Sequence, residues 1–215
     1  MAKPRRSNRR AQIMKSATLL FLEHGFDATS IAQIAEHSGI STPGIYYHFD
    51  GKQALLAAII HQTLDDLQKD RESIAREHPD AEERLRHLTY DHAVAITRDL
   101  TFDPTMLVID GPRALPPEDQ QKIAVRKRAH MEFIRDLLED LKEEGKLRDV
   151  DTTAGALTVV GMVAWIVKWY NPGGRLSAER AAETVTNIVM QSMIRDDRIS
   201  TPAMRELRAA GQTRK

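Results

Sequence analysis

The chain has 215 residues, of which 31 are lysine or arginine and 31 are aspartate or glutamate, so its formal net charge is zero. It contains no cysteine, which excludes a disulfide framework and a cysteine-based metal site and gives secretion no support. The length allows one or two domains with a sizeable core. The charge is unevenly placed, because the first ten residues hold five lysines and arginines and no acidic residue. This asymmetry, and not the net charge, indicates a nucleic-acid partner.

The basic N-terminal stretch is not followed by an apolar run of signal-peptide type. Basic arms of this kind order on DNA, where their contribution falls steeply with salt. A solvated tail is the alternative interpretation and is compatible with DNA binding. We expect four arginines to contribute to DNA binding: Arg5, Arg6, Arg9 and Arg10.

Residues 25–56 predict two short helices on a tight glycine turn, with another helix directly behind them. Ser30 and Gln33 have the spacing of a capping box, and Gly39 stands where a helix commonly ends on a left-handed glycine. Ser41 is a good N-cap for the second short helix. The arrangement predicts a helix-turn-helix, whose second helix is able to enter a DNA major groove. An ordinary helical hairpin with an exposed tyrosine pair is the alternative.

The helix expected to follow begins with a lysine in its first turn. Asp50 is expected to cap this helix, with Gln53 completing a capping box. The helix dipole disfavours a cation at Lys52, so a phosphate bound there would be held by the free amide groups and the lysine together.

Residues 9–56 resemble the DNA-binding domain of the TetR family of bacterial regulators. The resemblance is carried by Gly25-Phe26, Thr29-Ser30, Gly39-Ile40-Ser41, Tyr46, His48-Phe49 and Lys52. It implies that Tyr46 and Lys52 contact phosphates, and that residues of the second short helix face bases or backbone in the groove. The chain departs from the family at Thr42, often lysine, and Pro43, often glycine, so no operator sequence can be read from it. The DNA-binding residues expected besides the arginines are Thr29, Ser30, Ser41, Thr42, Pro43, Gly44, Tyr46, Tyr47, His48 and Lys52.

The rest of the chain predicts helices and no strands. Helices are expected over 51–77, from Asp80 onward, over 106–110, over about 118–144, from 151 or 152 to 169 or 170, and from 177 to about 195. The predicted fold is therefore all-α. Residues 1–50 form a three-helix helix-turn-helix domain, and residues 51–215 form a helical bundle for ligand binding and dimerisation.

The helix expected near 152–170 is apolar almost all round, which requires cover on two sides. One side is expected to face the domain core and the other an identical subunit, together with residues Ala181, Ala182, Val185, Ile188 and Val189. These two helices resemble the dimer interface of the TetR family, and burial wholly within one subunit is the alternative. The run 154–167 is fourteen residues, shorter than a membrane span, so no membrane partner is expected.

An apolar pocket between the middle helices is expected to take a small molecule. The residues expected to form it are Met106, Ile109, Met131, Phe133, Trp165, Lys168 and Trp169, each of which would also suit an ordinary core. The stretch 165–177 resembles a branch of the TetR family that regulates lipid, steroid or aromatic-acid breakdown and responds to acyl-CoA thioesters. That resemblance implies that phosphates of the effector would meet Lys168, Arg175, Arg113 or Lys127. A helix stop and turn that only shapes the dimer is the alternative.

The sequence thus predicts a cytoplasmic homodimeric repressor that binds a palindromic operator and is released by a small apolar effector, with an acyl-CoA thioester as a candidate. The alternatives are an activator, a response to another apolar molecule, a binder without a ligand, and an enzyme. The histidines 87, 92 and 130 do not align as metal ligands, and no nucleophile motif or phosphate loop is present, so no enzyme, metal or cofactor is expected.

Overall fold

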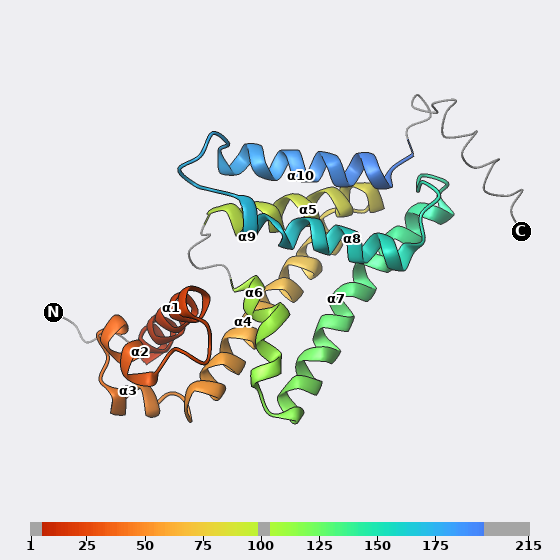
Figure 1. The fold of residues 1–215 in the computed structure, drawn as a ribbon. Coiled ribbons are helices and arrows are strands. Elements are labelled where there is room, and N and C mark those ends of the chain that lie inside the picture. The colour runs from red at the N-terminus through yellow and green to blue at the C-terminus, as the bar shows by residue number, and fades with distance from the viewer. Residues whose placement is uncertain (1–5, 99–103, 196–215) are drawn as a thin grey trace, which may run out of the picture.

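The computed structural model describes residues 6–98 and 104–195, and these ranges contain helices without a β-sheet. Three helices form the N-terminal part: α1 (Arg6–His24), α2 (Ile31–Ser38) and α3 (Thr42–Tyr46). They gather at the N-terminal end of the long helix α4 (Lys52–Glu77), as Figure 1 shows. The expected all-α fold is confirmed. Arg5 lies outside the described residues, as does the side chain of Arg6.

The remaining helices form a second bundle around the far end of α4. They are α5 (Ala81–Arg98), α6 (Thr105–Asp110), the 3-10 turn η1 (Gly111–Ala114), α7 (Pro117–Glu143), α8 (Thr152–Ala164), α9 (Ile166–Trp169) and α10 (Ala178–Met193). In Figure 1, α10 and α5 lie along α8 and α9 on one side, while α7 begins near the start of α4 and runs away from the N-terminal helices toward α8. The expected helix bounds agree to within a few residues, and the residues at which three of these helices were expected to begin, Asp80, Asp151 and Ser177, each accept a backbone hydrogen bond.

Two details at helix ends differ from the sequence prediction. The start of α4 is not capped by Asp50: Gly51 occupies the N-cap at φ 104°, and no side chain caps it. Gln53 instead donates to the carbonyl of Ala114 in η1. The apolar helix expected to run unbroken from 152 to about 170 is interrupted at Trp165, so that α8 and α9 are separate.

The segment Thr152–Trp169 has the length and composition that could cross a membrane, although its apolar run of residues 154–167 was expected to be too short. In this structure α8 packs against α7, α5 and α10, and the buried Val159 and Val163 belong to the core of the bundle. Buried core helices of soluble proteins meet the same criterion of length and composition. The finding is therefore weak evidence for a membrane span.

The buried core of the N-terminal part does not end at residue 50. It continues along α4 as far as Leu64 and also contains residues from α6, η1 and the start of α7: Leu107, Val108, Leu115 and Ile123. Gly111 lies so close to α4 that a Cβ there would come within 3.2 Å of Ile60 Cδ1. The α6–η1 segment is therefore packed against the helix that supports the helix-turn-helix.

Candidate DNA-binding and effector sites

The helix-turn-helix is held by the predicted capping chemistry. Ser30 Oγ accepts from the amide of Gln33, and Gln33 Oε1 accepts from the amide of Ser30 at 2.7 Å. Gly39 adopts the left-handed conformation at φ 65° and closes α2. Ser41 Oγ accepts from the amide of Gly44 and caps α3. Ile45 is fully buried beneath α3, so the opposite side of this short helix faces outward.

The exposed side of α3 carries the residues expected to meet DNA. Tyr46 and Tyr47 are 54% and 66% exposed, and Pro43 is exposed beside them. Thr42, Gly44 and His48 are partly buried, and the Tyr47 and His48 rings meet in a T-shaped arrangement. These residues lie on one surface, and the hydroxyl group of Thr42 is at the N-terminal end of α3. Their contacts with DNA stay predictions.

Thr29 and Lys52 hold the turn between α1 and α2. The buried Thr29 hydroxyl donates to the carbonyls of Leu20 and Gly25. The Lys52 ammonium donates to the carbonyls of Phe26, Asp27 and Thr29 at 2.7, 3.3 and 2.9 Å, and lies over the Phe26 ring. An ammonium has three donors, and all three are used here. Both side chains therefore have a structural function, and a phosphate contact by Lys52 would require it to release a carbonyl.

The basic N-terminal stretch is helical from Arg6 onward, so only its first residues precede α1. Arg9 and Arg10 are exposed near the start of α1. The Arg10 guanidinium lies 5.0 Å from the centroid of the Phe49 ring, directly after α3. This places Arg10 beside the C-terminal end of the helix-turn-helix.

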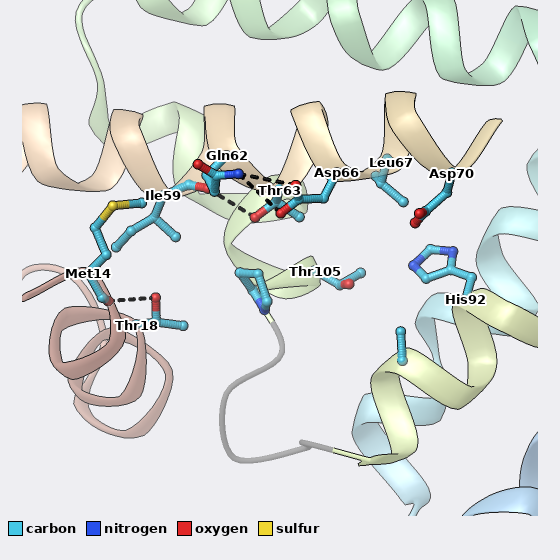
Figure 2. A pocket seen from close by; sticks show the side chains of 12 residues that line it. Met14, Thr18, Ile59, Gln62, Thr63, Asp66, Leu67, Asp70, His92 and Thr105 are labelled. Atoms are coloured by element: carbon cyan, nitrogen blue, oxygen red, sulfur yellow. Dashed lines mark hydrogen bonds between the residues drawn. The ribbon is translucent and has the colours of Figure 1, made fainter. Parts of the chain in front are cut away.

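Two adjoining cavities lie between α4 and the helices of the second bundle. The inner chamber has a volume of about 90 Å³ and is lined by Thr63, Leu64, Leu67, His92, Thr105, Val108, Ile109, Lys127, His130, Met131, Val160 and Ala164. The outer chamber, about 260 Å³, is shown in Figure 2 and reaches Met14 and Thr18 on α1. The chambers share four lining residues, namely Thr63, Leu67, His92 and Thr105. Each exceeds the space that one water needs, so together they leave room for part of a small molecule.

The two chambers differ in charge. The outer chamber contains the carboxylates of Asp66 and Asp70, and Gln62 donates to Asp66. Figure 2 shows Asp70 beside the His92 ring. Burial raises the pKa of Asp70, with the nearby charge of Asp66 acting in the same direction. The inner chamber has no carboxylate among its lining residues.

His130 is the most strongly perturbed titratable group of the cavity. Its ring is 7% exposed, and Nδ1 lies 2.9 Å from Nη1 of Arg71 on α4. Burial, followed by the charges of His92 and Arg71, lowers the pKa of His130 to about 3. The imidazole is therefore neutral at physiological pH.

The residues expected to form the ligand pocket are separated in the structure. Ile109 and Met131 line the inner chamber. Phe133 lines neither chamber, and its ring lies 5.9 Å from the Arg71 guanidinium. Trp165 and Trp169 are 63% and 43% exposed, because the helix breaks at Trp165 and directs these rings outward.

Met106 and Lys168 lie instead in a cleft between the two parts of the molecule. The cleft is lined on one side by the end of α1 and on the other by α6, η1 and α9, and its volume is about 790 Å³. Arg113 lines it together with Lys168, and the carboxylates Asp27 and Asp110 are also present. The structure thus brings together two of the four basic residues that the acyl-CoA resemblance implied.

Helix α8 presents an apolar stripe to the outside. Leu157 and Trp165 are 59% and 63% exposed, and Gly161 lies between them with open space around it. On α10, Ile188 is 49% exposed. The other four residues expected at a subunit interface are buried within the chain: Ala181, Ala182, Val185 and Val189. Their burial follows from the packing of α10 on α5, which takes up the more apolar side of the helix.

The family is decided by comparison with known proteins. Residues 78–193 match the family described as "Tetracyclin repressor-like, C-terminal domain", and residues 13–59 match "Bacterial regulatory proteins, tetR family". The chain belongs to the TetR family of bacterial regulatory proteins. The resemblance noted from the sequence is therefore confirmed over both parts of the chain.

Individual relatives cover nearly the whole chain. The HTH-type transcriptional repressor KstR2 of Rhodococcus jostii (strain RHA1) is 27% identical over 191 residues, which are 87% of this chain and 92% of that protein. The structure of AibR in complex with isovaleryl coenzyme A and operator DNA has a TM-score of 0.76 at 28% identity, over 84% of this chain and 97% of that one. The ketosteroid transcriptional regulator KstR2 of Mycobacterium tuberculosis has a TM-score of 0.78 at 26% identity, over 87% of this chain and 96% of that one.

The polar residues of the cavity in this TetR-family chain were not predicted from the sequence. His92, His130, Thr63 and Thr105 all line the inner chamber, yet none was expected at a ligand site. His92 and His130 were judged only as metal ligands, for which their spacing is unsuitable. The signal that could have found His130 is a histidine on the apolar side of α7, one turn before Ile134.

Proposed function

We propose that the chain is a ligand-responsive transcriptional repressor that acts in the cytoplasm as a homodimer, binds a palindromic operator, and is released from it by an acyl-CoA thioester. In this proposal residues 1–50 are the DNA-reading unit and residues 51–215 the effector and dimerisation unit. DNA binding, the effector response and dimerisation are each supported by a different region of the molecule.

The surface of α3 supports DNA binding. Tyr46 and Tyr47 stand exposed on a short helix whose other face is fixed by the buried Ile45, and Arg10 lies nearby. Phosphate contacts by such residues fix the register of a recognition helix in the major groove. The loop held by Thr29 and Lys52 keeps α2 and α3 in place for that contact.

The position of α6 is the single observation that carries the effector response. Its residues Thr105, Val108 and Ile109 line the inner chamber, while Leu107 and Val108 belong to the buried core of the N-terminal part. Lys127 also donates to the carbonyl of Val108. A molecule in the chamber therefore meets a segment that is packed against the support of the helix-turn-helix. A ligand shifts such an arrangement only through its difference in affinity for the two states.

The acyl-CoA class is supported by the relatives and by the distribution of charge. AibR was solved with isovaleryl coenzyme A and operator DNA, and that structure shares this fold over most of the chain. The acyl group is proposed to occupy the apolar inner chamber. The outer chamber has the carboxylates Asp66 and Asp70 and no lysine or arginine in its lining, which disfavours a phosphate there. The cleft has Arg113 and Lys168 in addition to its two carboxylates, so the nucleotide is proposed to lie at the cleft.

The exposed stripe on α8 and α10 supports dimerisation. Leu157, Trp165 and Ile188 are large apolar side chains open to solvent on adjoining helices. Apolar surface of this kind marks a protein interface. A two-fold dimer presents two recognition helices to successive turns of DNA, as a palindromic operator requires.

The proposal is tested with the full-length protein and a labelled duplex from the region upstream of its own gene. We expect a shift that competitor DNA of another sequence does not abolish and that weakens as salt rises. Isovaleryl-CoA is expected to reverse the shift, whereas free coenzyme A serves as the control that lacks an acyl group. A sequence-specific complex that acyl-CoA thioesters of various chain lengths leave unchanged would contradict the effector part alone.

A further inference from the structure

His130 stands between a cation and the inner chamber. On the side of the ring that faces α4, Nδ1 lies 2.9 Å from Arg71 Nη1. On the inner side, the ring belongs to the lining of the chamber, to which Arg71 does not contribute. The side chain is 7% exposed, so it is fixed by its surroundings and has little access to bulk water.

The arginine determines which ring nitrogen of His130 carries the proton. A guanidinium has donors and no acceptor, so Nδ1 must act as the acceptor of this hydrogen bond. In a neutral imidazole the proton then resides on Nε2, which becomes a donor. The positive charge of Arg71 at the other end of the ring withdraws electron density and strengthens that donor.

The Nε2–H group has no acceptor among the described residues, since the contact with Arg71 is the hydrogen bond that His130 makes there. Nε2 is also not fully enclosed by protein. Among the described residues, the fully buried side-chain polar atom without a partner is Thr186 Oγ1, and Nε2 of His130 does not meet that description. Two other polar groups of the lining donate to backbone carbonyls: the Thr63 hydroxyl to that of Ile59, and one N–H of the Lys127 ammonium to that of Val108. The hydrogen bond with Arg71 thus fixes His130 Nε2 as a donor at the wall of a largely apolar chamber.

We infer that His130 Nε2 is the specificity-determining donor of this chamber and binds a carbonyl oxygen of the effector. The inference rests on the proposed function, in which the effector is an acyl-CoA thioester, and it assigns the acceptor as the thioester carbonyl. An apolar pocket with one fixed donor selects a ligand that supplies the matching acceptor, because an analogue without it leaves the buried donor unpaired.

The test compares two ligands that differ at one oxygen atom. Isovaleryl-CoA is set against S-(3-methylbutyl)-CoA, the thioether in which the carbonyl is replaced by a methylene group. Binding to the full-length protein is measured by isothermal titration calorimetry. We expect the thioester to bind roughly tenfold more tightly than the thioether, the effect of about one well-placed hydrogen bond.

Two variants assign that preference to His130. His130→Phe keeps an aromatic ring without a donor and should bind both ligands within about twofold of each other. His130→Gln keeps a donor and an acceptor and should recover part of the preference. With a carbonyl-labelled thioester, the infrared carbonyl band should move to lower frequency on binding to the wild type and move less in His130→Phe, a readout that a purely structural role would leave unchanged.

The outcomes distinguish the role of His130 from the proposed class of effector. Equal binding of thioester and thioether by the wild type, or full discrimination by His130→Phe, overturns the role of His130 and leaves the proposed effector class standing. Failure of both ligands to bind overturns the proposed acyl-CoA effector, and this inference with it.

Discussion

The ammonium of Lys52 donates to the carbonyl oxygen of Phe26 at 2.7 Å, linking the first turn of α4 to the loop between α1 and α2. The same ammonium reaches the carbonyls of Asp27 and Thr29. This relationship changes what is expected of Lys52, since a residue that resembles a phosphate contact is engaged in holding the DNA-binding unit together.

We expect Lys52→Met to lower the free energy of unfolding by about 1–3 kcal/mol, because three carbonyls lose a charged donor. Urea unfolding measures this loss. The dependence of operator affinity on salt separates the two roles: a phosphate contact would reduce the slope of log K against log salt by about one, and a structural role leaves it unchanged. We expect the unchanged slope.

Tyr46 and Tyr47 are exposed, so their removal should affect DNA binding and spare folding. We expect Tyr46→Phe to weaken operator binding roughly three- to tenfold, the effect of one lost hydrogen bond, with the unfolding midpoint unchanged. Fluorescence anisotropy with a labelled duplex measures the affinity. Tyr90→Phe on α5 is the matched control, and an equal loss in that variant would argue against a specific role for Tyr46.

Gly51 supplies a backbone conformation at φ 104° and ψ −175° that side chains rarely adopt. We expect Gly51→Ala to cost about 1–3 kcal/mol of stability. A Cβ at this position would have open space, so the cost comes from the backbone conformation and not from a clash with neighbouring atoms. Thermal and urea unfolding provide the measurement. A variant as stable as the wild type would show that the start of α4 relaxes to a different conformation.

Charge on the stripe of α8 and α10 should separate the subunits. We expect the double variant Leu157→Glu with Ile188→Glu to be monomeric by light scattering and to keep its helical circular dichroism, because both side chains are exposed in the single chain. Val125→Glu is the control, since Val125 is 63% exposed on α7 and its replacement should leave the dimer intact. Dimers of unchanged stability in the double variant would place the interface elsewhere.

The lowered pKa of His130 makes stability depend on pH in acid. The folded chain keeps the ring neutral down to about pH 3, whereas the unfolded chain protonates it below about 6.5. Between these values the unfolded state binds more protons, so stability falls as the pH falls, by up to about 1.4 kcal/mol per pH unit from this group. His130→Gln should reduce that slope in urea unfolding at pH 7, 6 and 5. A slope equal to that of the wild type would show that other groups cause the pH dependence.

The helix-turn-helix was predictable from local chemistry. The ends of its two short helices depend on contacts between residues three or four positions apart. The structure uses the predicted residues for these contacts: Ser30 with Gln33, Gly39 and Ser41. The N-cap at Gly51 was missed because Asp50 is a better cap by composition, whereas in the structure Gln53, expected to complete the capping box, donates to Ala114 in η1.

The cavity was less predictable because it depends on which side of each helix faces inward. Trp165 suited a pocket by composition, but the break between α8 and α9 turns it outward. His130 was discounted as a metal ligand, and its tautomer follows from Arg71, 59 positions earlier in the chain. Neither fact is encoded in local periodicity.

The central claim is that a molecule in the inner chamber acts on the helix-turn-helix through α6. The most direct measurement is the operator affinity of wild type and Val160→Phe, with and without isovaleryl-CoA, since Val160 lines the chamber and is only partly buried. We predict that the ligand raises the operator Kd of the wild type at least fivefold, whereas Val160→Phe binds operator and no longer responds. An operator Kd that the ligand leaves unchanged in the wild type, or a full response in Val160→Phe, would contradict the account.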